Sequence, residues 1–251
     1  MSDAWVLGQR ALREGWRTPE ALLPTLFIPL FFLVVNVGQA AKIFPSAETE
    51  FLYGQGYGAF QLPSSLLLAA SFGTAALFLV EEIEGGYFDK LRAAPIARSS
   101  IVMGRLIAEF FKAFLVAAAI VVLGIIFGIS IASGVIGCLV LILLTALWAV
   151  VYTGYMQLIA LKTRSAAATN SGSLIFFPLL FLTPNFVPRD LLTRPMEIAA
   201  TLNPVTYVME GLRSLILEDL NWAVIARGFA VVAILGAVMV TLSVRTIRNY
   251  D

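Results

Sequence analysis

The stretch GVIGCLVLILLTALWAVVYTGYMQLIAL, residues 134–161, contains no Asp, Glu, Lys or Arg. A bilayer core about 30 Å thick requires about 20 helical residues, and soluble core helices seldom stay apolar on every side for that length. The alternation of polar and apolar residues that is typical of a transmembrane barrel strand is absent from it. Because lipid forces each backbone amide to bond within its own segment, this stretch predicts a transmembrane helix.

The same criterion, applied outward from this stretch, predicts a chain of six transmembrane helices. The predicted spans are residues 21–41, 61–80, 106–129, 134–161, 166–187 and 222–244. Only 13% of the residues are charged, well below the roughly 25% of soluble domains. We therefore expect an all-α integral membrane protein, with residues 1–251 forming one domain.

Residues 3–17 differ from the spans, because they are too short and too charged to cross a bilayer. As a helix they place Trp5 and Trp16 on one face and arginines on the other. Tryptophan on the apolar face and arginine on the polar face are typical of a helix that lies in the membrane interface. A soluble amphipathic helix packed on a partner is the alternative interpretation.

Lysines and arginines predict the orientation, because cytoplasmic loops hold the excess of them. With the N-terminus inside, eleven fall in inside segments and five in or near outside segments, while Lys112 lies within the third span. The inside set is Arg10, Arg13, Arg17, Lys90, Arg92, Arg98, Arg105, Lys162, Arg164, Arg245 and Arg248. The outside set is Lys42, Arg189, Arg194, Arg213 and Arg227. We expect a multi-pass cell-membrane protein with both termini in the cytoplasm.

Composition also argues against several kinds of function. A net charge of +1 provides no basic field for nucleic acid. The chain has no histidine, and Cys138 is its single cysteine, so neither an internal disulfide nor a Cys/His metal site is expected. The phosphate-loop pattern GxxxxGK[ST] is absent, so we expect no bound cofactor and no enzymatic activity in this chain. ATP and Mg would then belong to a partner subunit.

The predicted inside loop 81–105 reads EEIEGGYFDKLRAAPIARSSIVMGR. Gly85 and Gly86 are expected to end the helix that leaves the second span. A short helix then follows, with Tyr87 and Phe88 gathered on one side and charged residues in water. An exposed aromatic group flanked by charges is typical of docking into a partner's groove, and a solvated loop lying on lipid headgroups is the alternative.

Two further features lie outside the predicted spans or at their edge. Asn203 followed by Pro204 predicts a capped helix start, and the apolar spacing that follows predicts a short helix on the outer leaflet or dipping into it. Glu109 and Lys112 share a face of the third span, near its cytoplasmic end. A local ion pair and a proton or substrate relay are both open interpretations of these two charges.

Two stretches resemble the recurring patterns of ABC-2 type transporter permeases, in the drug-resistance and nodulation-export branch. One is EEIEGGYFDKLRAAPI (81–96) followed by Gly-Arg at 104–105, and the other is NFVPRD (185–190) running into NPVTYVMEGLR (203–213). The resemblance covers the whole chain. The family often has Thr-Leu where this chain has Tyr87-Phe88, a difference expected to alter a contact surface more than its role.

The resemblance implies an assembly. Two permeases, either two copies or a copy and a paralogue, would pair in the lipid above two cytoplasmic ABC ATPase subunits. Residues 3–17 would be the connecting helix, a coupling helix would lie near 82–93, and 188–218 would form short extracellular re-entrant helices. The residues expected to face the ATPase subunit are Glu81, Glu82, Glu84, Tyr87, Phe88 and Arg92.

The resemblance also implies a substrate path along spans one, two and five. Amides within apolar spans need partners or a wet cavity, and aromatic faces suit amphiphiles, although helix packing is the alternative role. The candidates are Asn36, Gln39, Asn170, Phe176, Phe177 and Phe181. The expected function is the permease subunit of an ATP-driven exporter of a drug-like amphiphile, as in multidrug resistance. Export of a lipid-linked glycan or lipid is the main alternative, and a secondary transporter is a lesser one.

Overall fold

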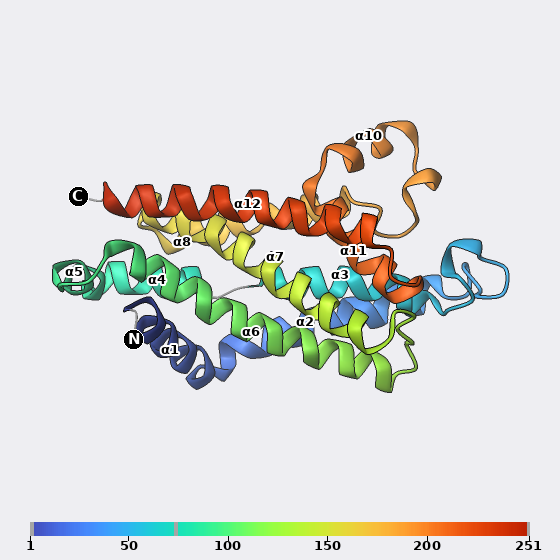
Figure 1. The fold of residues 1–251 in the computed structure, drawn as a ribbon, viewed down its shortest axis with the longest axis horizontal. Helices are drawn as coiled ribbons and strands as arrows, with labels where there is room; N and C mark the ends of the chain where they lie inside the picture. Colours follow the sequence, from blue (N-terminus) through green and yellow to red (C-terminus); the bar gives the residue numbers. More distant parts are fainter. Residues whose placement is uncertain (1–2, 73–74, 250–251) are drawn as a thin grey trace.

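The computed structural model describes residues 3–72 and 75–249, in which helices dominate and no β-strand occurs (Figure 1). The side chains of residues 16, 19–22 and 75, which include Trp16, also lie outside the description. Within the described residues, five stretches are long and apolar enough to cross a membrane. They are α2 (Pro19–Ala40), α3 (Tyr57–Ser71) taken with α4 (Ala75–Glu84), α6 (Arg98–Ile126), α7 (Gly134–Thr163) and α12 (Trp222–Arg248). The second predicted span, 61–80, includes residues 73 and 74, outside the described ranges.

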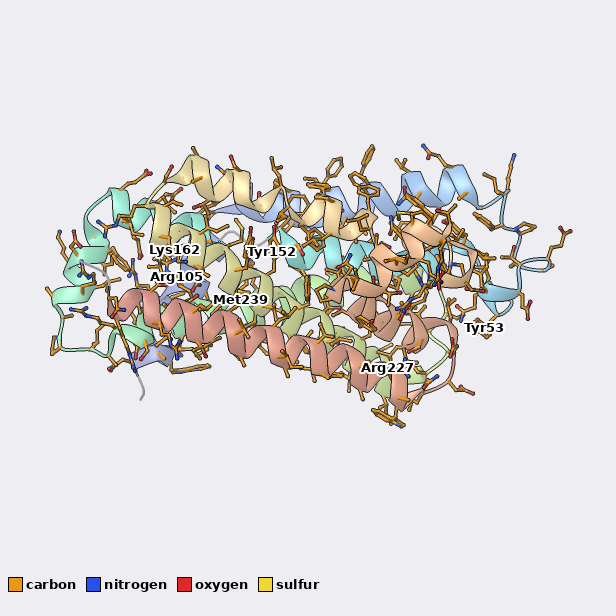
Figure 2. The ribbon with its side chains drawn as sticks, turned by 90° about the horizontal axis from the view of Figure 1, so that it is seen from above. Tyr53, Arg105, Tyr152, Lys162, Arg227 and Met239 are labelled. Carbon is orange, nitrogen blue, oxygen red and sulfur yellow. The ribbon has the colours of Figure 1, made fainter. Side chains whose placement is uncertain are left out.

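The two ends of the molecule carry different segments. Helices α1 (Asp3–Arg17) and α5 (Tyr87–Ala93) and the last turns of α12 lie at one end, which we call the α5 end (Figure 1). The loop between α2 and α3, with η1 (Glu50–Leu52), lies at the opposite end, the η1 end. Figure 2 places Arg105 and Lys162 toward the α5 end, and Tyr53 and Arg227 toward the η1 end. The segments predicted to be inside thus gather at one end.

The predicted fifth span is not a continuous helix. Its residues form α8 (Ala166–Ser173) and α9 (Phe176–Phe181), joined by a tighter turn. In that turn the amides of Leu174 and Ile175 donate to carbonyls only three residues back. Pro178 has no amide hydrogen to donate to the previous turn, and Pro184 follows shortly after the helix ends. The prediction of one helix over 166–187 is therefore wrong.

Asn203 connects α9 to α11 (Pro204–Leu217), although residues 182–202 separate these two helices in the sequence. Its Nδ2 donates to the Leu179 carbonyl at 2.6 Å, while its Oδ1 accepts from the Val205 amide at 3.0 Å. The predicted helix cap at Asn203 is confirmed. Between α9 and α11 in the sequence, η2 (Arg189–Leu191) and α10 (Arg194–Leu202) lie to one side of the bundle (Figure 1).

Helices α8, α9 and α11 together run the length of the molecule. The start of α8 lies at the α5 end, where the Ala166 amide donates to Glu84 Oε1 at 3.4 Å. The end of α11 lies at the η1 end, where Gln55 Nε2 donates to the Ile216 carbonyl at 2.8 Å. One end-to-end passage of the described chain is therefore assembled from three short helices.

Helix α11 lies inside the bundle rather than on its surface. It packs against α12, α3 and α7, and six of its apolar side chains are fully buried: Val205, Val208, Met209, Leu212, Leu215 and Ile216. A Cβ on Gly228 of α12 would lie 3.2 Å from the Tyr207 carbonyl, so glycine permits this close approach. The helix belongs to the larger hydrophobic core and not to a leaflet surface.

Candidate functional site

The predicted docking helix α5 is anchored by Phe88, which is 1% exposed. Phe88 belongs to the smaller hydrophobic cluster, with Leu79 of α4, Ile101 of α6 and Ile247 of α12. Gly86 adopts a φ of 71°, which turns the chain back and presents this ring to the ends of the spanning helices. The expectation that Phe88 is exposed is wrong, because so short a helix is held in place by burying an apolar side chain.

Glu82 also points inward. It is 7% exposed, lies 2.7 Å from Arg10 Nη2 and forms a second ion pair with Arg105. The Arg10 guanidinium carbon lies 4.3 Å from the centre of the Tyr87 ring. Helices α1, α4, α5 and α6 thus meet in one charged cluster. Glu82 is occupied within the protein and does not present its carboxylate to a partner in this conformation.

The remaining predicted docking residues stay accessible. Glu81, Glu84 and Tyr87 are exposed at the α5 end, and Tyr87 keeps 39% of its area in solvent. Arg92 is half-buried and pairs with exposed Asp89 at 3.3 Å. We call the exposed residues Glu81, Glu84, Tyr87, Asp89 and Lys90 the α5 face.

A second site lies between α2, α3 and α9, toward the η1 end. It is a small cavity of about 20 Å³, which we call the α9 pocket. Its lining comprises Phe32, Asn36, Ser64, Ser65, Leu68, Phe177, Leu180, Phe181 and Asn185. Three of the six predicted path residues therefore lie together. Gln39 and Asn170 are exposed away from it, and Phe176 is buried on the other side of α9, with its ring 5.4 Å from that of Tyr152.

A buried hydrogen-bond network forms the polar side of the α9 pocket. Gln61 Nε2 donates to the Tyr57 hydroxyl and to the Asn185 carbonyl, both at 2.9 Å. Ser64 Oγ donates to Asn185 Oδ1 at 2.5 Å, and Asn36 Nδ2 lies 3.4 Å from Gln61 Oε1. These bonds fasten the segment after α9 to α3. Gln61 and Ser64 were missed, although polar residues so close together within a predicted span were an available signal.

Arg213 of α11 is buried against the same segment. Its Nη1 donates to the Pro184 carbonyl at 2.9 Å, and its guanidinium carbon lies 3.6 Å from the centre of the Phe60 ring. A backbone carbonyl and an aromatic face are thus in direct contact with this charge. The sequence placed Arg213 among the outside charges, whereas it is only 8% exposed and lies inside the bundle.

Glu109 and Lys112 form the local ion pair that was one of the two interpretations. Lys112 Nζ lies 2.9 Å from Glu109 Oε2, and both side chains are buried in α6. Each charge therefore has a partner one helical turn away.

The comparison with known protein families matches residues 2–217 to the ABC-2 type transporter. The chain belongs to the ABC-2 type transporter family. It is 23% identical over 244 residues to the daunorubicin resistance ABC transporter permease protein DrrB1 of Streptomyces coeruleorubidus, covering 96% of this chain and 84% of that protein. It is 27% identical over 231 residues to ycf38 of Porphyra purpurea, named as a transport permease, covering 86% of this chain and 74% of the relative. The chain is thus a multi-pass membrane protein of a transport permease family.

In this ABC-2 transporter, the two halves of each stretch that carried the resemblance meet in space. Glu82 of the first stretch pairs with Arg105, which follows it by more than twenty residues. In the second, Arg189 of the first half pairs with Glu210 of the other half at 2.9 Å. Each stretch therefore builds one junction between helices.

Proposed function

We propose that this chain is the membrane subunit of an ATP-driven exporter that moves a drug-like amphiphile out of the cytoplasm or the inner leaflet. Membership of the ABC-2 family and the likeness to a daunorubicin resistance permease support this proposal. Two ABC ATPase subunits would bind ATP and Mg below the membrane, and a second permease would complete the translocation path.

The main support for this proposal is that α5 is anchored to the spanning helices by a buried side chain. Phe88 packs against α4, α6 and α12, while neighbouring Tyr87 is exposed at the tip of the molecule. A partner that pushes on the α5 face therefore pushes on three spanning helices at once. A loop that only lay on lipid headgroups would have no need for this anchor.

The proposed topology places the α5 end in the cytoplasm of a cell whose plasma membrane holds the protein. The five long helices and the composite passage through α8, α9 and α11 then give six crossings. Val205, at the start of α11, shares a cavity with Leu235, the central residue of α12. The proposal accordingly makes α10 and α11 the re-entrant helices, because α11 begins at mid-bilayer depth and returns to the outside.

The α9 pocket is our candidate for part of the substrate path. It combines two phenylalanine rings of α9 with amide and hydroxyl groups of α2 and α3, a mixture that suits an amphiphile. At about 20 Å³ it holds no drug-sized molecule, so this conformation is closed there. Opening would require α9 to move from α3 and break the bonds of Asn185 to Gln61 and Ser64.

Tyr87→Ala tests the coupling role, because it removes an exposed ring without touching the buried anchor. The permease would be reconstituted with its ATPase in liposomes, and ATPase stimulation, complex formation and daunorubicin efflux would be measured. Tyr53→Ala is the matched control, since Tyr53 is 60% exposed at the η1 end. We expect Tyr87→Ala alone to lower stimulation and efflux. Equal activity of the two variants would refute docking at α5.

A further inference from the structure

A second cavity lies on the other side of α9 from the α9 pocket. It measures about 150 Å³, and we call it the α12 cavity. Its lining comprises Trp148, Val151, Tyr152, Tyr155, Ile175, Leu179, Pro204, Val205, Leu235 and Met239. Figure 2 labels Tyr152 and Met239, which belong to two of its walls. Only six residues of α9 separate it from the pocket that we assign to transport.

The α12 cavity lies at the middle of two spanning helices. Trp148 is at the centre of α7, and Leu235 is at the centre of α12. Helices α7 and α12 are in close contact both before and after the cavity along their length. A Cβ on Gly154 would lie 3.1 Å from Met239 Cβ, and a Cβ on Gly228 would lie 3.3 Å from Leu144 Cδ2. In a membrane the medium beside this cavity is therefore the hydrocarbon centre of the bilayer.

The polar side-chain atoms of the lining have hydrogen-bond partners outside the cavity. The Tyr152 hydroxyl donates to the Ser173 carbonyl at 2.7 Å, and the Tyr155 hydroxyl lies 3.4 Å from the Gly172 carbonyl. Trp148 Nε1 donates to Ser71 Oγ at 3.1 Å. An ordered water needs two to four polar partners, so the α12 cavity is unsuited to water and to the polar end of an amphiphile.

Its size and opening fit hydrocarbon. Ile175 at its edge is 47% exposed, so the cavity can be reached from the surrounding lipid. An apolar protein cavity of about 150 Å³ is known to stay dry and to bind benzene or xenon. Lipid tails are as apolar as this lining, so what favours filling is the recovery of dispersion contacts that an empty space forfeits.

We propose that the α12 cavity binds the terminal part of a lipid acyl chain that enters from the bilayer. The chain packs on Leu235 and Met239 of α12 on one side and on Ile175 and Leu179 on the other. The acyl chain therefore packs against the face of α9 that lies opposite the rings of Phe177 and Phe181. This inference rests on the cavity itself and does not depend on the transported substrate.

Quenching of Trp148 by brominated lipids tests the proposal. The protein has four tryptophans, so Trp5→Phe, Trp16→Phe and Trp222→Phe together leave Trp148 as the single fluorophore. Trp148 is only 4% exposed, and lipid outside the protein has little access to it. The full chain would be reconstituted in phosphatidylcholine vesicles carrying bromine near the methyl end or near the carboxyl end of the acyl chain.

We expect methyl-end bromine to quench Trp148 more strongly than carboxyl-end bromine. Leu235→Phe, which fills the cavity, should abolish most of that quenching. Ile234→Phe is the matched control, because Ile234 is 64% exposed, next in sequence and outside the lining. Leu179→Phe fills the cavity from the α9 side and repeats the test, and elution as a monodisperse protein confirms folding of each variant.

Two results would overturn the proposal. One is quenching that is absent, or unchanged in both cavity-filling variants. The other is disulfide formation between two chains through Leu235→Cys in a Cys138→Ser background, because a second copy would then cover the cavity in place of lipid.

Discussion

Gly104 of α6 and Gly8 of α1 bring the backbones of their helices into contact. A Cβ on Gly104 would lie 3.0 Å from the Gly8 nitrogen and 2.8 Å from Leu7 Cβ, and a Cβ on Gly8 would lie 3.0 Å from the Gly104 carbonyl oxygen. Small residues allow helices to approach this closely in membrane proteins. Helix α1 is therefore fixed to a spanning helix, in addition to any contact it makes with lipid.

Gly104→Ala should displace α1, because the added methyl group meets backbone atoms that have no rotamer to change. We expect a loss of about 1–3 kcal/mol of stability, against a gain of up to about 1 kcal/mol in helix propensity. Gly38→Ala is the control, since a Cβ there meets nothing within 4 Å. Thermal unfolding in detergent should show a lower Tm for Gly104→Ala alone, and equal values would contradict the tight contact.

Glu82→Ala should be far more damaging than removal of an exposed acid. It removes the carboxylate that pairs with Arg105, which is 6% exposed, and breaking a buried pair typically costs about 3–5 kcal/mol. Asp89→Ala breaks the exposed pair with Arg92 and should cost at most about 1 kcal/mol. Replacing both Glu82 and Arg105 by Met should restore part of the loss. Thermal unfolding of the three variants and the unchanged protein tests this, and similar losses of stability for Glu82→Ala and Asp89→Ala would argue against the buried cluster.

Asn203→Ala should weaken the composite passage. It removes a helix cap, worth about 0.5–2 kcal/mol, and also the bond to the Leu179 carbonyl. Asn221→Ala is a matched control, because Asn221 caps α12 through the Val224 amide and is exposed. We expect the larger drop in Tm, and a drop in efflux, from Asn203→Ala. A larger drop in Tm from Asn221→Ala would show that the bond between α9 and α11 adds nothing to the stability that a helix cap provides.

Cysteine labelling tests the orientation in a Cys138→Ser background. Ser46→Cys, exposed at the η1 end, should react with an impermeant maleimide in intact cells. Ala97→Cys, exposed between α5 and α6, should react only after permeabilisation. The reverse pattern would place α5 outside, away from any ATPase.

The sequence predicted the features that follow from local chemistry. Apolar length located α7, the two glycines located the turn before α5, and Asn203 located the start of α11. Each signal acts within a few residues of the structure that it specifies. The expected helix 3–17 matches the observed Asp3–Arg17, whereas the third span, expected from residue 106, belongs to a helix that already begins at Arg98.

The remaining features depend on contacts between segments distant in sequence. Phe88 is buried because α6 begins and α12 ends beside it, and no local pattern distinguishes it from exposed Tyr87. Arg213 lies inside because Pro184 and Phe60 supply a carbonyl and a ring. Pro178 is a visible cause of the break in the fifth span. The continuation of that span through α11 could not be predicted, because it depends on the hydrogen bond from Asn203 to the Leu179 carbonyl.

Helix α9 separates the α9 pocket from the α12 cavity, and this arrangement has a pharmacological consequence. Under the proposed opening, in which α9 moves away from α3, a compound bound on the Leu179 side of α9 would alter the affinity of a ligand bound on its Phe177 side, without competing for the same atoms. Thermodynamic reciprocity then requires the ligand on the Phe177 side to change the affinity of the compound on the Leu179 side by the same factor. Inhibitors of such a permease need not resemble what it carries: a wedge of plain hydrocarbon shape would be enough to hold α9 still.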